Sequence, residues 1–95
     1  MSEKYKELIE KVVKEEKKIV KKVAITTANK KVEGLKVDDD GNVLELSENG
    51  EKVFEHLYNS YKELGFGTAK IIIKKAIKPV LEDNPDLKVP EELRD

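Results

Sequence analysis

The feature that most constrains the fold is a pair of amphipathic segments, 51–64 and 69–81, joined by the run Gly65-Phe66-Gly67-Thr68. In the first segment the apolar side chains recur every three or four residues, which places them on one stripe of an α-helix. The stripe consists of Val53, Phe54, Leu57, Tyr58, Tyr61 and Leu64. Ser47 or Asn49 can cap the start of this helix, and Gly65 suits its left-handed end.

The second segment has a broad apolar face that continues across Pro79. Thr68 is placed to cap it as a helix. Two features compete with this interpretation. The β-branched run Ile71-Ile72-Ile73 also suits a buried strand, and Pro79 removes a backbone donor and clashes one turn back. We favour a helix because the apolar spacing persists beyond the proline, with a strand at 71–73 as the alternative.

Helical spacing also predicts an amino-terminal helix over residues 2–22, and pairs such as Glu7–Lys11 support it. Its apolar stripe is interrupted at 14–18, where Glu16 falls on the stripe. From Lys22 to Ala28 the apolar residues alternate with the others, which predicts a strand.

The clearest local signal is Asp40-Gly41, which suits the two central positions of a hairpin turn where both residues need positive φ. That turn sets the register. Leu35 faces Leu46, Lys36 faces Glu45 and Val37 faces Leu44. The apolar pairs then share one face of the hairpin, as a half-buried sheet requires.

These elements predict an α+β fold in the order αβββαα: an N-terminal helix, a small antiparallel sheet of two to three strands and two C-terminal helices. Ninety-five residues fit one domain, 1–95. Residues 82–95 carry six acids and two cations, and we expect them to form an acidic tail. Pro90 is placed to begin one helical turn there, and Leu87, Val89 and Leu93 are placed to attach the tail to the body.

Charged residues make up 41% of the chain, against about 25% in an average globular protein. Together with the absence of cysteine, this is typical of thermophile proteins with surface ion pairs, and it also suits an engineered sequence. No apolar run approaches the length of a membrane span, and the Lys/Glu-rich start lacks an apolar signal core. We therefore expect a cytoplasmic location and no membrane partner.

The charges are distributed in blocks of alternating sign. Residues 1–31 carry ten lysines and five acids, residues 32–64 three lysines and nine acids, and residues 65–81 four lysines and no acid. The simplest role of such blocks is to neutralise one another within the fold, each exposed pair contributing under about 1 kcal/mol.

The lysines of the third block are the candidate binding residues. They are Lys70, Lys74, Lys75 and Lys78. A solvated helix face is one interpretation, and a stripe that binds nucleic-acid phosphates or an acidic partner is the other. No aromatic residue is interleaved for base stacking and arginine occurs once, so the sequence favours the solvated face.

No motif supports catalysis, a metal or a cofactor. The acidic run 38–42 lacks the spacing of the helix-loop-helix calcium motif. The run 65–70 lacks the third glycine of the dinucleotide fingerprint, although an anion can still bind free amides from Thr68 onward. His56, the single histidine, is a poor basis for zinc binding or acid–base chemistry.

The sequence therefore favours a non-catalytic interaction module that binds itself, as a homodimer, or another protein. Self-association is favoured because a small sheet leaves its edges and one face open. Nucleic-acid binding through the Lys70–Lys78 stripe is the alternative. Anion or nucleotide binding at the Gly65–Thr68 hinge is the third hypothesis.

Overall fold

The computed structural model describes residues 3–64 and 69–94. Within these ranges the chain forms four α-helices, a two-stranded sheet and one 3-10 turn. They are α1 (Glu3–Val20), α2 (Lys22–Lys31), β1 (Leu35–Val37), β2 (Val43–Leu46), α3 (Gly50–Glu63), α4 (Ala69–Asp83) and η1 (Glu91–Leu93). The predicted α+β class and the antiparallel sheet are confirmed.

The predicted order is wrong at one element, because the segment expected to form the first strand is helix α2. The order is therefore ααββαα, with two strands in the described chain instead of three. Ala24 and Ala28 are fully buried, whereas Val23 is 47% exposed. Two buried residues that are four apart in the chain lie on the same face of a helix. Packing of this face against α1 and α3 has overridden the short alternating pattern.

A single residue, Lys21, separates α1 from α2. Its backbone has φ 58° and ψ −132°, a region that favours glycine over residues with a side chain. The chain therefore turns between two helices at the point where one continuous helix was predicted to end.

The hairpin is confirmed, but its loop is one residue longer than predicted. The Gly41 amide donates to the Asp38 carbonyl at 3.0 Å, and the Asp38 amide donates to the Asn42 carbonyl at 2.9 Å. Gly41 has φ 90°, whereas Asp40 is not in the positive-φ region. The connection is thus a three-residue loop closed by a left-handed glycine, not the two-residue turn that needs positive φ twice.

The longer loop changes one pair of the predicted register. Leu35–Leu46 and Lys36–Glu45 pair as predicted, but Val37 faces Val43 instead of Leu44. A bulge lies between the Val37–Val43 pair and the Lys36–Glu45 pair, and beyond it the strands pair in the predicted register. It leaves Val43 buried and turns Leu44 outward, where it is 64% exposed.

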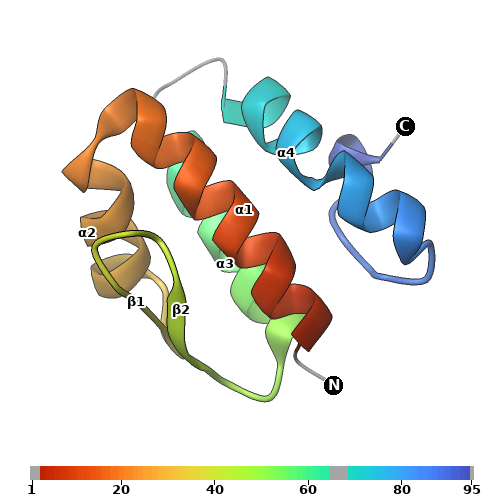
Figure 1. Ribbon diagram of the computed structural model, residues 1–95, viewed down its shortest axis with the longest axis horizontal. Coiled ribbons are helices and arrows are strands. Elements are labelled where there is room, and N and C mark those ends of the chain that lie inside the picture. Colours follow the sequence, from red (N-terminus) through yellow and green to blue (C-terminus); the bar gives the residue numbers. More distant parts are fainter. Residues whose placement is uncertain (1–2, 65–68, 95) are drawn as a thin grey trace.

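Helix α1 is the central element of the molecule and packs against α2, α3 and α4 (Figure 1). In Figure 1, α3 lies behind α1, α4 lies along one side of it, and α2 and the hairpin lie on the other side. The largest fully buried side chains come from α1, α3, α4 and η1, and include Leu8, Ile9, Phe54, Leu57, Tyr58, Tyr61, Ile73, Ile77 and Leu93. No helix in the described ranges has both the length and the apolar character needed to cross a bilayer.

The two helices predicted in the second half of the chain are confirmed. The Asn49 side chain caps α3 by accepting from the Lys52 amide at 3.2 Å. Helix α4 includes 71–73, so the strand alternative is wrong, and it continues through Pro79 to Asp83. The Gly65–Thr68 hinge, with the predicted end of α3 and the cap of α4, lies outside the described residues.

Residues 84–94, which we call the tail, follow the surface of the body. The Tyr5 hydroxyl donates to the Lys88 carbonyl at 2.9 Å and accepts from the Lys88 amide at 3.0 Å. Leu93, in the 3-10 turn that follows Pro90, is only 2% exposed, which confirms the predicted attachment. The Arg94 guanidinium donates to the carbonyls of Leu87 and Pro85 and so holds the tail in its own bend.

Candidate functional site

The predicted lysines of α4 lie on two flanks of the helix. Lys74, Lys75 and Lys78 line a groove between α4 and the tail, and Lys75 also lines a crevice between α4 and α1. Lys70 lines neither surface. A hydrogen bond from Lys62 is the main cause of the lowered pKa of Glu92, and the charge of Lys70 lowers it further. Thr68 lies outside the described residues.

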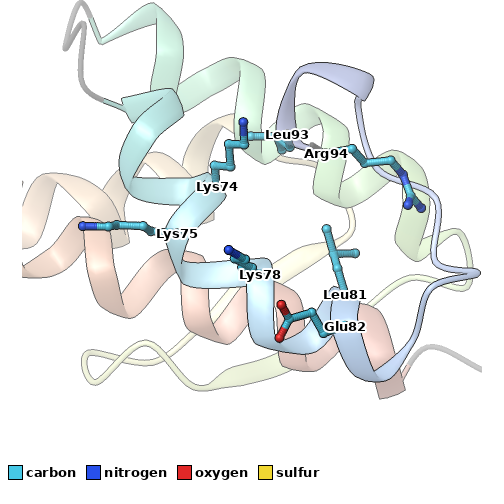
Figure 2. A pocket seen from close by; sticks show the side chains of 7 residues that line it. All are labelled: Lys74, Lys75, Lys78, Leu81, Glu82, Leu93 and Arg94. Carbon is cyan, nitrogen blue, oxygen red and sulfur yellow. The ribbon is translucent and has the colours of Figure 1, made fainter.

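The first surface, which we call the tail groove, has a volume of about 370 Å³ (Figure 2). Its lining residues are Lys74, Lys75, Lys78, Leu81 and Glu82 of α4 with Leu93 and Arg94 of the tail. Figure 2 shows Leu81 pointing into the space between α4 and the tail, and Lys75 extending away from the tail. The groove therefore combines an apolar floor with lysine ammonium groups along its α4 side.

The second surface, which we call the α1–α4 crevice, has a volume of about 500 Å³. It is lined by Glu15, Lys18 and Ile19 of α1 and by Ile72, Lys75 and Ala76 of α4. A smaller hollow continues it along α1 past Lys14 and Lys11. Ile19 is 50% exposed, and Ile71, on the outer face of α4, is 60% exposed. Ile19 therefore offers an apolar side chain to solvent within the crevice, and Ile71, next to Ile72 in the chain, offers another outside it.

The crevice is strongly basic. Together, the crevice and the smaller hollow that continues it are lined by four lysines, Lys11, Lys14, Lys18 and Lys75, and by one acid, Glu15. Glu15 is paired with Lys18 at 3.0 Å. Residues three and four apart share a helix face, so positions 11, 14, 15 and 18 form one row beside the core stripe of α1. The lysine spacing in α1 is visible in the sequence, but the identity of the helix that lies next to this row is not.

Glu16 is the most unusual buried side chain. It is 1% exposed, and its Oε2 has no hydrogen-bond partner within the described ranges. Burial raises the pKa of this carboxyl. Tyr61, whose hydroxyl donates to the Ala24 carbonyl at 2.9 Å, has a pKa raised by burial and by the charge of Glu16. A perturbed carboxyl can mark an active site when it lies in a cleft, but Glu16 lines neither the groove nor the crevice.

The acidic run of the hairpin has a structural role. The Asp38 carboxylate accepts from the amides of Asp40 and Asn42, each at 2.9 Å. These bonds, the one from Asn42 first, lower the pKa of Asp38. In the part of the chain that the structure describes, no group of His, Cys, Asp or Glu side chains is arranged to hold a metal ion.

Comparison of the chain with protein-family models, with curated proteins and with solved structures finds no match. The two surfaces beside α4, the tail groove and the α1–α4 crevice, are therefore the candidate sites of function.

Proposed function

We propose that the protein is a non-catalytic interaction module that binds an acidic, amphipathic segment of a partner protein in the α1–α4 crevice. The observation that carries this proposal is the combination of the exposed Ile19 and the half-buried Ile72 with an excess of lysines on one surface. A helix with one apolar stripe and acidic flanks can place the stripe on the floor and its carboxylates beside the lysines.

The apolar part of the crevice favours a protein partner over nucleic acid. Ile19 and Ile72 offer contacts to apolar side chains, which a phosphate backbone does not supply. Base stacking needs exposed aromatic rings. Phe54, Tyr58 and Tyr61 are buried in the core. The described cations beside the crevice are lysines, which act as point charges and lack the planar fork of arginine.

The charge of the crevice also bears on self-association. A two-fold dimer through this surface would place the same patch of both copies in contact. The lysines of the two copies would then face one another, and like charges across an interface are costly. The sheet edges are short, at three and four residues, and so offer little template for a second chain. The proposed partner is therefore a different, acidic protein, and light scattering should give the monomer mass of 10.8 kDa.

The test uses a fluorescent synthetic peptide with leucines at i, i+3, i+4 and i+7 and glutamates at the other positions, measured by fluorescence anisotropy. We expect binding that weakens as salt is raised, because lysine–carboxylate attraction contributes to it. A control peptide with serine in place of leucine should bind much more weakly. Ile72→Ser should weaken binding of the leucine peptide. Leu44→Ser, which removes an exposed apolar side chain on the hairpin, far from the crevice lining, should leave it unchanged.

Nucleic-acid binding through the Lys70–Lys78 stripe is the second candidate, and the number of lysines on adjacent helices favours it. Lys11, Lys14 and Lys18 of α1 lie on the side of α4 that carries Lys75, and Lys74 and Lys78 line the tail groove. This candidate predicts binding of a DNA duplex or single strand that falls steeply with salt and weakens on Lys74→Glu. Strong oligonucleotide binding that Ile72→Ser leaves intact, with no binding of the leucine peptide, would replace the first proposal by this one.

A further inference from the structure

We infer that the tail groove is a binding site for a small aliphatic carboxylate, separate from the α1–α4 crevice. The anionic head is placed at the lysines of α4, with Lys78 as its main contact. The alkyl chain lies over Leu81 toward Leu93. This site goes beyond the proposed docking of a partner protein and depends on different observations.

The volume and lining of the groove define the class of ligand. About 370 Å³ is at the small end of the range for ligand sites, which is too small for a folded partner or a nucleic-acid strand. Leu81 points into the groove, Leu93, only 2% exposed, lies at its floor, and Lys74 and Lys78 add positive charge along α4 (Figure 2). A ligand that matches both parts carries a charge at one end and a hydrocarbon chain at the other.

The charges of the lining favour a head group with a single negative charge. Lys78 has no ion pair within 4.0 Å in residues 3–64 and 69–94, so its ammonium group is open to a ligand. Glu82 also lines the groove and adds one negative charge. The Lys78 ammonium can neutralise a carboxylate, whereas a dianion needs a second open cation, and Lys75 extends away from the tail (Figure 2). Arg94 raises the local positive potential, but its donors are engaged by the Leu87 and Pro85 carbonyls.

The groove is preformed, because the wall opposite α4 is held from several sides. Tyr5 fixes Lys88 through two hydrogen bonds. Lys62 pairs with Glu92 at 2.8 Å, next to Leu93 in the chain. A ligand site whose walls are already ordered loses less free energy to ordering on binding.

The experiment titrates the full chain with octanoate, below its micelle concentration, and follows the methyl NMR signals of Leu81 and Leu93. We expect saturable shifts at these two residues. Acetate, which has the charge without the chain, and 1-octanol, which has the chain without the charge, should each bind at least about threefold more weakly. Octyl phosphate and phospholipid vesicles test whether a dianionic or a membrane-borne head group is preferred instead, and preference for either would overturn the assignment.

Two variants locate the site. Lys78→Gln should weaken octanoate binding by roughly three- to tenfold, because it removes a charged contact at a partly solvated position. Lys18→Gln removes a lysine from the α1–α4 crevice and should leave octanoate binding unchanged. Saturable shifts at Ile19 and Ile72 in place of Leu81 and Leu93, equal loss in both variants, or no binding at all would each refute the inference. The leucine-peptide assay reports on the crevice, so the two proposals can fail independently.

Discussion

Replacement of Glu16 tests the description of the core most directly. The side chain lies on the core stripe of α1, and Oε2 has no hydrogen-bond partner in the described part of the chain. A buried polar group without a partner costs about 1–3 kcal/mol, and more when it is charged. Methionine has a similar length and no polar atom that needs a partner. We therefore expect Glu16→Met to raise the free energy of unfolding at pH 7 by about 1–3 kcal/mol.

The same substitution should change how stability depends on pH. Burial raises the pKa of Glu16 in the folded state above the ordinary value of a glutamate carboxyl. Between the unfolded and the folded pKa the native state binds more protons than the unfolded state, so this group makes stability fall as pH rises. The stability that Glu16 contributes at low pH, where its carboxyl is neutral, is fully lost once the pH exceeds its pKa in the folded state. Glu16→Met removes this decline, and its advantage over the wild type should therefore shrink as the pH is lowered toward 4.

The assay is guanidinium unfolding followed by circular dichroism at several pH values, with thermal unfolding beside it. In a domain of this size each kcal/mol shifts Tm by about 4–8 °C. Glu7→Met, an exposed position on the same helix, is the matched control and should change stability by less than about 0.5 kcal/mol. A loss of more than 1 kcal/mol in Glu16→Met would show that the carboxylate has a stabilising partner. A gain that is independent of pH would show that folding does not raise the pKa of Glu16, and either result would refute the reasoning.

Three further predictions concern the backbone, the tail and the tyrosines. Lys21→Gly should stabilise the protein by about 1 kcal/mol in guanidinium unfolding, because glycine adopts φ 58°, ψ −132° without the strain that a side chain causes. The same change at Lys22, the first residue of α2, should give no such gain, because Lys22 already has helical backbone angles. Tyr5→Phe removes both hydrogen bonds to Lys88, and we expect faster amide exchange in the tail and a loss of about 1 kcal/mol, whereas unchanged exchange at Lys88 would refute this role. Burial, followed by the interaction with the neighbouring Glu92 carboxylate, raises the pKa of Tyr58 from 10.0 to about 12, so the contribution of Tyr58 to stability should decline as pH rises above 10. An ultraviolet absorbance titration in which all three tyrosines ionise near pH 10 would contradict this.

The parts of the fold that follow from local chemistry were predictable. The three- and four-residue spacing from Val53 to Tyr61 defines α3, and Asn49 caps it as expected. The persistence of the apolar face beyond Pro79 identified α4 in spite of its β-branched run. In each case the signal extends over more than two helical turns, which a short competing pattern does not outweigh.

The errors arise where two local structures suit the same few residues. Residues 22–28 alternate well enough for a strand, and only contact with α1 and α3 selects the helix that buries Ala24 and Ala28. In the hairpin, Asp-Gly suits a two-residue turn. The Asp38 carboxylate instead binds the amides of Asp40 and Asn42, and the loop gains a residue. These side-chain hydrogen bonds compete with backbone pairing in the turn, and the preference of Asp-Gly for a two-residue turn does not account for them.

The candidate surfaces depend on tertiary packing of the charged blocks. Blocks of alternating sign were expected to neutralise one another, and Lys17 does approach Asp40 of the acidic block at 3.9 Å. Helix α4, however, packs along α1, so two lysine-rich blocks share the crevice that Lys18 and Lys75 line. Like charges on adjacent helices raise the free energy of the folded state by a small amount for each pair. An acidic partner would remove that repulsion and cover the exposed isoleucines in the same step. This is the physical reason to place the partner at the crevice and not at the sheet.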